Sequence, residues 1–307
     1  MKIGGLMRDG KTKIVVRISD GLGNQLFQFA LGKYLADKLG CEMVFDKTHF
    51  MLSRYRRFLL DKFLGPNKIK RWVFFKELLF IPLWCVKVKF GDNVFRKVLR
   101  FLGIKWLKVR SPFLFQDEFS GDIALDGERT IYISGCYGHL PHMPTREMMR
   151  QQLKVLVENA ENDRLYGGEM KSAESVSVHI RRSDYLLASN GAPALDICYQ
   201  RRAMKEILEN LKAPKWFFFS DDVEWCRKEF SDFENAVFVS GNEDAPYEDI
   251  RLMSLCKHHI IANSTFSWWG AYLGDDSGMT IYPRPWFKGL EMPSSCVPSK
   301  WVAVSSE

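Results

Sequence analysis

The chain has 307 residues, which is enough for two domains, because a single hydrophobic core stops growing near ~250–300 residues. Its 46% hydrophobic and 26% charged residues exclude a disordered or fibrous protein. The net charge of +7 is uneven, because residues 51–110 contain 16 Lys or Arg and three acids, a net charge of +13 that leaves −6 for the rest. This local excess favours one basic interaction surface and argues against a protein that coats nucleic acid along its length.

Cysteine usage and the N-terminal residues bear on the compartment. The seven cysteines are scattered, odd in number and without a C-x-x-C pair, which is typical of a reducing compartment. Residues 1–13 contain no apolar segment of a secretory signal, and the most apolar window, residues 72–90, is interrupted by charges and a proline. We therefore expect a cytoplasmic protein without a membrane-spanning helix.

The first elements predict a β-α-β unit. They are a strand at 14–18, a tight loop at 19–24, a helix at 25–39 and a strand at 42–45. A glycine loop that leads into a helix leaves backbone N–H groups to hold an anion or a polar sugar edge. Gly21 and Gly23 lack the third glycine of a dinucleotide fingerprint, so NAD is not predicted. A glycine turn that serves only close packing is the alternative.

Residues 50–110 mix basic and aromatic side chains, and we expect helical pieces among them. A basic, aromatic-rich amphipathic surface suits an anionic membrane, at about 1 kcal/mol for each Lys or Arg near the surface. A solvated basic face over a buried aromatic core explains the same pattern equally well. Because no recognised nucleic-acid module accompanies the charge, nucleic acid is not predicted as a partner.

The rest of the chain alternates strands and helices. A strand that runs into a loop at 131–139 and a helix at 145–157 precede a polar stretch at 159–175, where we place the domain boundary. The strands that follow are at 175–180, 216–219, 236–239, 258–262 and 279–282. The helices are at 196–211, after Asp222 as far as residue 230, at 247–257 and from residue 264 onward. This alternation predicts an α/β fold with a parallel, doubly wound sheet, which binds ligands outside the carboxyl ends of its strands.

Two polar motifs stand at such strand ends. Arg181 and Arg182 follow the strand at 175–180 and supply fork-shaped donors that match phosphate oxygens. An Arg–Asp ion pair that only finishes the strand is the alternative. Asn263-Ser264-Thr265 begins a helix, where hydroxyl and N–H groups favour phosphate or ribose, and a plain N-cap is the alternative.

Asp221 and Asp222 follow the strand at 216–219. Metal-dependent sugar transferases hold a divalent ion with an Asp-x-Asp pair, but the two acids here are adjacent and the arginines already supply charge. We favour a hydrogen-bonding role toward a base or ribose, or an N-cap, and predict no metal. Trp268 and Trp269 are expected to pack in the core rather than to form a stacking platform.

Three motifs, in this order, are similar to those of the α-1,2-fucosyltransferase family. They are Gly21-Leu22-Gly23-Asn24-Gln25-Leu26-Phe27-Gln28-Phe29-Ala30, His179-Ile180-Arg181-Arg182-Ser183-Asp184-Tyr185 and Asn263-Ser264-Thr265-Phe266-Ser267-Trp268-Trp269-Gly270-Ala271. The resemblance spans residues 14 to about 283. It implies a GT-B architecture, in which two Rossmann-like domains with parallel sheets face each other across a cleft. We place the acceptor-side domain at 1–165, with the basic insertion at about 50–110, and the GDP-sugar-binding domain at 166–307.

The resemblance also implies roles for residues in these motifs. Arg181 and Arg182 would hold the phosphates of GDP-fucose, His179 would lie on the nucleoside side, and Asp184 would orient the arginines. Asn24 and Gly23, in the facing loop, would lie near the fucose and the reacting centre. Asp221, Asp222, Asn263, Ser264 and Thr265 complete the expected donor-binding set, and no cofactor is expected beyond the donor substrate.

Two departures from the family pattern concern the acceptor. Asp20 stands where the family usually has a glycine, and Cys136-Tyr137-Gly138-His139 replaces the usual Gly-Tyr-aromatic-Gln, so Tyr137 and His139 are our acceptor-binding candidates. For catalysis, Arg181 is expected to stabilise the negative charge that develops on the β-phosphate as the bond to fucose breaks. Asp20 and Asn24 are candidates, by position, for polarising the acceptor hydroxyl.

The predicted function is transfer of L-fucose from GDP-fucose to a galactose-terminated acceptor, with inversion and without a metal, in surface-polysaccharide synthesis. A lipid-linked acceptor would bring the protein to the inner membrane as a peripheral protein, with the basic segment as its docking face. Two other interpretations stay open. One is a metal-dependent glycosyltransferase that uses another nucleotide sugar, and the other is a nucleotide-sugar or RNA-binding protein without catalysis.

Overall fold

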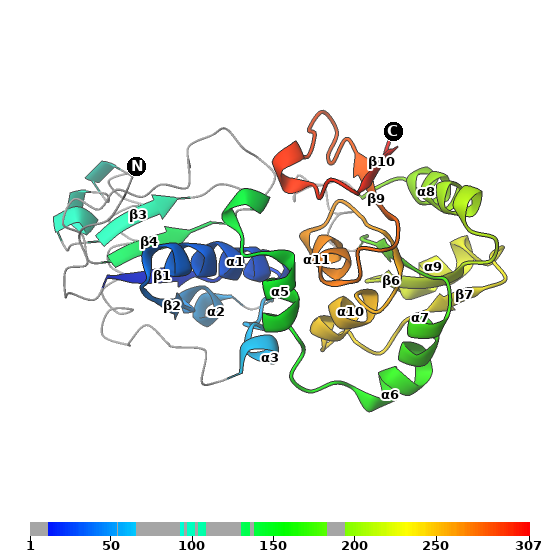
Figure 1. Ribbon diagram of the computed structural model, residues 1–307, viewed down its shortest axis with the longest axis horizontal. Coiled ribbons are helices and arrows are strands. Elements are labelled where there is room, and N and C mark those ends of the chain that lie inside the picture. Colours follow the sequence, from blue (N-terminus) through cyan, green and yellow to red (C-terminus); the bar gives the residue numbers. More distant parts are fainter. Residues whose placement is uncertain are drawn as a thin grey trace.

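The structure is a computed structural model. It describes residues 12–53, 55–65, 93–94, 97–101, 104–108, 130–135, 138–182 and 194–307. Within these residues two parallel β-sheets lie side by side, with helices packed on and between them (Figure 1). The predicted α/β fold and the parallel strand pairing are confirmed.

The first sheet belongs to the N-terminal half, which we define as residues 12–152. Its strands are β1 (Lys13–Arg17), β2 (Glu42–Asp46), β3 (Ile104–Lys108) and β4 (Thr130–Ser134), in the order β2-β1-β4-β3. β1 is central, and its Val15 pairs with Val44 on one side and Tyr132 on the other. β3 was not predicted, because its sequence Ile-Lys-Trp-Leu-Lys lies in the basic segment, where lysines obscure the apolar pattern of a strand.

The helices of this half are α1 (Leu22–Leu39), α2 (Thr48–Leu52), α3 (Asp61–Leu64), the 3-10 turn η2 (Leu140–His142) and α5 (Arg146–Gln152). The predicted helix at 145–157 has Thr145 as its N-cap, but it ends five residues early. After Gln152 the chain leaves the helix, and the Leu156 N–H donates to the Lys62 carbonyl at 2.9 Å. Val157, expected on the apolar face, is 80% exposed as a result.

The second sheet belongs to the C-terminal half, which we define as residues 160–307. Its strands are β5 (Ser175–Ile180), β6 (Lys215–Ser220), β7 (Ala236–Phe238), β8 (His258–Ile260), β9 (Thr280–Arg284) and β10 (Val302–Ser305). They are parallel in the order β10-β9-β8-β5-β6-β7. β5 is a fully buried inner strand, as its apolar sequence predicted, whereas the edge strand β10 was not predicted.

Helices connect these strands and join the two halves. They are α6 (Ala160–Asn162), the π-helical turn η3 (Asp163–Gly167), α7 (Gly168–Ser172), α8 (Ile197–Asn210), α9 (Val223–Glu229), α10 (Pro246–Met253), α11 (Thr265–Leu273) and the 3-10 turn η6 (Ser294–Cys296). The segment from α6 to α7 carries the chain from the first sheet to the second (Figure 1). It is helical and lies within the polar stretch at 159–175 where the domain boundary was predicted.

Helices α1 and α11 make a hydrophobic contact between the two halves. The Phe27 ring lies 4.7 Å from the Trp268 ring and 4.9 Å from the Trp269 ring, and both tryptophans are fully buried, so the predicted core packing is confirmed. Arg146 of α5 reinforces this contact, because it donates to the carbonyls of Tyr272 at 2.7 Å and of Gly274 at 2.9 Å, at the C-terminus of α11. The helices thus hold the two sheets in a fixed relation.

Candidate active site

A pocket of about 750 Å³ lies between the two halves. Its walls are formed by the carboxyl ends of β1, β5, β6, β7 and β8 and by the loops that follow them, which is the ligand-binding edge of parallel sheets. The predicted site residues that line it are Asp20, Gly23, Asn24, His179, Arg181, Asp221, Ser264 and Thr265. The fold therefore brings together residues that are up to 245 positions apart in the sequence.

The N-termini of α1 and α11 meet at this pocket. A Cβ at Gly23 would lie 2.5 Å from the backbone carbon and from Oγ1 of Thr265, so a larger residue would force the helices apart. The Thr265 hydroxyl donates to Asn24 Oδ1 at 2.9 Å and so joins the two halves. Ser264 caps α11, since its Oγ accepts from the Phe266 N–H at 3.3 Å. Two helix N-termini with their N–H groups and positive dipole ends make a site for an anion.

Asp20 occupies the tight turn between β1 and α1. Its φ is 64°, in the left-handed region that favours glycine, which explains why a glycine is the usual residue at this place of the motif. Its carboxylate accepts a hydrogen bond from the Ser19 hydroxyl at 2.8 Å. The carboxylate of Asp20 therefore stands at the pocket wall on the N-terminal half.

Two buried glutamines hold this turn. Gln25, fully buried, donates to the carbonyls of Asp20 at 3.0 Å and Arg57 at 2.8 Å, and its Oε1 accepts from the Leu59 N–H at 3.0 Å. Gln28 Oε1 accepts from the backbone N–H of Ser19 at 2.9 Å. Sequence analysis gave neither glutamine a role, although both belong to the first motif, and a polar residue on an otherwise apolar helix face was the signal.

Arg181 reaches the pocket from the end of β5. Its Nη1 lies 3.0 Å from Oδ2 of Asp221, at the end of β6, and both side chains are mostly buried. Because β5 and β6 are paired neighbours, their carboxyl ends bring this cation and this anion together. The ion pair fixes the guanidinium in the pocket wall, and a guanidinium can serve several acceptors at once.

Arg182 has a different environment and is not among the residues that line the pocket. Its guanidinium lies 3.7 Å from the centre of the Trp225 ring, and its Nε donates to Asp222 Oδ2 at 3.1 Å. Asp222 also caps α9, where its Oδ1 accepts from the Trp225 N–H at 3.3 Å. Arg182 and Asp222 thus make the ion pair and the N-cap that the sequence analysis gave as alternatives, and their contacts with the donor stay a prediction.

His179 lies in the pocket wall two residues before Arg181. It is 5% exposed, and its ring centre is 5.5 Å from that of Phe266. Burial, and to a smaller extent the charge of Arg181, lower the pKa of His179 to about 3. His179 is therefore a neutral hydrogen-bonding group at physiological pH, and its buried Nδ1 has no hydrogen-bond partner among the described residues.

Asp249, a residue that sequence analysis missed, lines the pocket from the first turns of α10. Its Oδ1 accepts a hydrogen bond from Asn242 Nδ2 at 2.8 Å. Burial, with a smaller contribution from the negative charges of Glu243 and Glu248, raises the pKa of Asp249 to about 7, although the hydrogen bond from Asn242 lowers it. A half-buried carboxyl group with such a pKa is common at functional sites.

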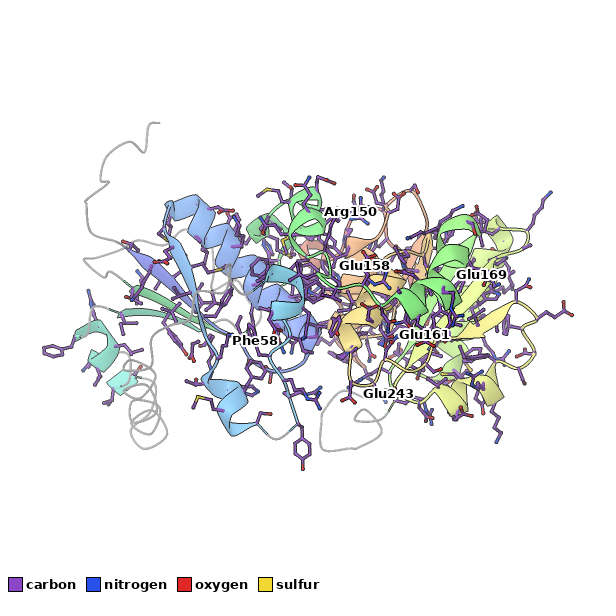
Figure 2. All side chains as sticks on the ribbon, turned by 90° about the horizontal axis from the view of Figure 1, so that it is seen from below. Phe58, Arg150, Glu158, Glu161, Glu169 and Glu243 are labelled. Carbon is purple, nitrogen blue, oxygen red and sulfur yellow. The ribbon has the colours of Figure 1, made fainter. Side chains whose placement is uncertain are left out.

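A basic rim, which we define as Tyr55, Arg56 and Arg57, lines the pocket on the N-terminal half. Arg56 lies beside the N-terminus of α1, since a Cβ at Gly21 would be 3.7 Å from its Nη1. Arg57 Nη1 lies 3.3 Å from Oδ1 of Asp244 on the opposite half, in an exposed ion pair. Figure 2 labels Phe58, the residue after Arg57, and Glu243, the residue before Asp244, and shows them on the two sides of the boundary between the halves.

Other predicted residues lie elsewhere. Asn263 lines a second cavity of about 450 Å³, together with Trp286 and Phe287, and not the first pocket. His139 packs on His142, with ring centres 4.5 Å apart, and does not line the pocket. Asp184 and Tyr137 lie outside the described residues. Among the residues that the structure describes, no group of three or more His, Cys, Asp or Glu could hold a metal ion.

Residues 13–303 match the family model described as Glycosyl transferase family 11. The chain belongs to this family. An alpha-1,2-colitosyltransferase of Escherichia coli is 32% identical to this member of family 11 over 95% of the chain and 98% of the relative. The O-antigen biosynthesis glycosyltransferase WbnK of Escherichia coli is 30% identical over 89% and 94%. A galactoside alpha-(1,2)-fucosyltransferase 1 of Aotus azarae is 30% identical over 43% of this chain and 38% of the relative.

Solved structures place this family 11 chain in the GT-B fold. The fucosyltransferase NodZ from Bradyrhizobium superposes with a TM-score of 0.56 over 86% of this chain and 94% of that one, at 16% identity. NodZ alpha-1,6-fucosyltransferase soaked with GDP-fucose gives a TM-score of 0.54 over 86% and 93%, also at 16% identity. The expected fold of two Rossmann-like sheets that face each other across a cleft is confirmed.

The pocket of this family 11 chain can therefore perform glycosyl transfer with a fixed cation and two helix N-termini. A departing diphosphate gains negative charge as the sugar bond breaks, and groups that bind this charge more strongly in the transition state accelerate the step. Arg181, held by Asp221, presents a fixed cation of this kind on the pocket wall, and Asp20 and Asn24 lie on the opposite wall.

Proposed function

We propose that the chain transfers L-fucose from GDP-fucose to a hydroxyl group of a terminal galactose, with inversion and without a required metal. The observation that carries this proposal is the placement of Arg181 and the N-termini of α1 and α11 on the walls of one pocket of about 750 Å³. The relatives that transfer fucose or colitose in α-1,2 linkage support the same reaction. Residues 1–165 form the acceptor-side domain in this proposal, and residues 166–307 bind the donor.

The donor is proposed to lie along the C-terminal wall. Arg181, Ser264 and Thr265 would contact the diphosphate, because a guanidinium and a helix N-terminus are both anion sites. The guanine base would lie toward His179 and Asp249. A carboxylate accepts hydrogen bonds from two adjacent N–H donors, and the N1–H and exocyclic amine of guanine form such a pair.

The acceptor is proposed to enter from the N-terminal wall. Inversion requires the acceptor hydroxyl to attack the face of the fucose opposite the diphosphate, and a nearby hydrogen-bond acceptor would polarise it. Asp20 is the carboxylate on that wall and Asn24 is its amide neighbour, so both keep their proposed roles. Tyr137 and His139 stay proposals for acceptor binding, and His139 lies outside the set of residues that line the pocket.

A second donor is supported by a specific observation. The relative at 32% identity that aligns over 98% of its length transfers colitose, which is L-fucose without its 3-hydroxyl group. A pocket that gives this hydroxyl a hydrogen-bond partner would discriminate strongly between the two sugars, whereas a pocket that only makes van der Waals contact would not. GDP-fucose and GDP-colitose are therefore the pair of donors that must be compared directly.

Peripheral contact with the inner membrane is also proposed, for a lipid-linked acceptor. None of the helices in the described ranges is long and apolar enough to cross a bilayer. In the described part of residues 50–110, Tyr55 is 92% exposed and Phe101 is 90% exposed, each beside basic residues. Flotation with vesicles that contain anionic lipid should show binding at low salt that is lost at high salt, and absence of binding at low salt would remove this proposal.

The test of the reaction is a panel of GDP-fucose, GDP-colitose, GDP-mannose and UDP-galactose, with a galactose-terminated disaccharide as acceptor, with and without EDTA. We expect GDP to be released only from GDP-fucose, or from GDP-fucose and GDP-colitose. EDTA should not reduce this release. Turnover with UDP-galactose alone, or loss of activity in EDTA, would favour a metal-dependent transferase of another nucleotide sugar. Tight GDP binding without turnover of any donor would favour a binding protein.

A further inference from the structure

A chain of buried amide groups leads from the pocket to the segment that joins the two halves. Asp249 Oδ1 accepts from Asn242 Nδ2 at 2.8 Å, and Asn242 Oδ1 in turn accepts from Asn162 Nδ2 at 2.8 Å. Asn242 is 4% exposed and Asn162 is 5% exposed, so water does not serve these groups. In Figure 2 their chain neighbours, Glu161 and Glu243, lie on the same side of the C-terminal half.

The direction of these hydrogen bonds fixes the orientation of the Asn242 amide. Because Asn162 offers its NH₂ group, Asn242 presents its oxygen to Asn162 and its own NH₂ group to Asp249. The opposite orientation would place an amide oxygen against the carboxyl group and two NH₂ groups against each other. Buried polar groups without a partner cost as much as a lost hydrogen bond, so that orientation is disfavoured.

An ion-pair cluster anchors the outer end of this chain. Arg251 of α10 donates to Glu248 Oε2 at 3.0 Å and to Asp163 Oδ1, in the π-helical turn, at 2.9 Å. Asn162 Nδ2 lies 3.5 Å from the same Glu248 oxygen. The helix that carries Asp249 is thereby tied to the segment that carries Asn162. Single π-helical turns are rare and often occur at functional sites.

We propose that Asn242 and Asn162 are positioning residues for donor binding, which hold the Asp249 carboxylate in the orientation that receives the nucleobase. This inference rests on the proposed function, because it takes a guanine nucleotide as the ligand. With one oxygen fixed by Asn242, the carboxylate presents its remaining lone pairs to the N1–H and the exocyclic amine of guanine. None of the three sequence motifs contains either asparagine.

The same contacts affect the charge of Asp249. Its pKa is raised to about 7, mainly by burial and to a smaller extent by the negative charges of Glu243 and Glu248, whereas the hydrogen bond from Asn242 lowers it. The other titratable and charged residues that line the same pocket are His179, Arg181, Asp221 and Asp244 on the C-terminal half and Asp20, Arg56 and Arg57 on the N-terminal half. Since the protonated carboxyl is a poorer acceptor, GDP affinity should fall as the pH drops below about 7. Loss of the Asn242 bond should move that fall to higher pH.

The experiment is a double-mutant cycle on GDP affinity, measured by calorimetry at several pH values between ~6 and ~9, with wild type, Asn242→Ala, Asp249→Asn and the double variant. Asn242→Ala should weaken GDP roughly tenfold, the size of a lost hydrogen bond to a charged group, and should shift the pH dependence upward. In the Asp249→Asn background the same change should have no further effect. IDP, which lacks the exocyclic amine, should bind more weakly than GDP to wild type and about equally to Asp249→Asn.

Two further variants keep the inference testable. Asn162→Ala should shift the pH dependence of GDP affinity in the same direction as Asn242→Ala, by a smaller amount. It is the variant to measure if Asn242→Ala fails to fold. Asn210→Ala, an exposed amide that donates to the Glu206 carbonyl at 3.0 Å, is the matched control and should leave GDP affinity unchanged. Equal losses from Asn242→Ala in both backgrounds, or no loss at all, would overturn the inference. Failure of wild type to bind GDP would instead overturn the proposed function.

Discussion

The two walls of the pocket are built in different ways. On the C-terminal wall, charged groups are held by other charged groups or buried amides, as in the pairs Arg181–Asp221 and Asn242–Asp249. On the N-terminal wall, neutral glutamines hold the backbone of the loops, and the basic rim extends into solvent, with the Arg57 side chain 73% exposed. The first arrangement fixes side chains, whereas the second fixes only the backbone from which side chains project.

This difference fits a division of labour between donor and acceptor. A donor with a constant diphosphate needs preorganised charges, because groups that must reorganise during the reaction lose their electrostatic advantage. A wall that fixes only the backbone tolerates changes of its exposed side chains, which suits the acceptor-binding role proposed for it. Changes on the C-terminal wall should therefore affect turnover, and changes on the N-terminal wall should affect acceptor binding and stability.

The largest effect is expected from Arg181→Ala. Removal of the cation that is proposed to stabilise the leaving diphosphate should cost about 3–4 kcal/mol in activation free energy, a loss of about 10²–10³ in kcat. Arg182→Ala is the matched control, because it removes an arginine that stacks on Trp225 outside the pocket. Its kcat should stay within about threefold of wild type while its Tm falls. A kcat/KM for Arg181→Ala within tenfold of wild type would remove the catalytic role.

Gly23→Ala should break the contact between the walls. The new Cβ would lie 2.5 Å from Thr265 backbone, which cannot move as a flexible side chain would, so we expect a loss of about 2–3 kcal/mol in the free energy of unfolding. Gly168→Ala is the control, since a Cβ there meets no atom within 4 Å and the helix should be slightly more stable. Urea denaturation of both variants is the measurement. Wild-type stability of Gly23→Ala would mean that the helices do not approach closely.

Gln25→Ala tests how the N-terminal wall is held. It leaves the Asp20 and Arg57 carbonyls and the Leu59 N–H without their side-chain partner, and we expect a loss of about 2 kcal/mol in stability with a raised KM for the acceptor. Gln151→Ala removes an exposed hydrogen bond to Glu147, and it should change neither the stability nor the acceptor KM by a measurable amount. If the KM for GDP-fucose rose and the acceptor KM did not, the assignment of the two walls would be reversed.

Arg57→Ala should have the smallest effect. The ion pair with Asp244 is exposed, with 73% and 90% of the two side chains accessible, and such pairs contribute about 0–1 kcal/mol. We expect unchanged stability and an acceptor KM raised about threefold at low salt, with the difference disappearing at high salt. Arg227→Ala, which removes another exposed ion pair outside the pocket, should leave both KM values unchanged. A salt-independent loss of kcat would show that Arg57 acts in the chemical step.

The sequence predicted what depends on local pattern. Buried strands such as β5 and the alternation that follows it gave the parallel sheet, and the glycine loop before α1 located one wall of the pocket. It placed both Arg181 and Arg182 on the phosphates and chose Arg181 for catalysis, but it could not show that Arg181 lines the pocket and Arg182 does not, because the directions of adjacent side chains at a strand end depend on the fold. Asp249 and Asn242 were missed because their importance arises from contacts between segments far apart in sequence. β3 was missed because its lysines interrupt the apolar pattern, and β10 was missed because its four residues are too few to show a pattern.

The most direct measurement is the affinity of GDP and of guanosine for wild type, Arg181→Ala and Arg182→Ala, by calorimetry in the presence of EDTA. The account predicts that wild type and Arg182→Ala prefer GDP strongly over guanosine, and that Arg181→Ala loses most of this preference while its affinity for guanosine is unchanged. Loss of the preference in Arg182→Ala but not in Arg181→Ala would contradict the account. The diphosphate would then be held outside the pocket at which the N-termini of α1 and α11 meet.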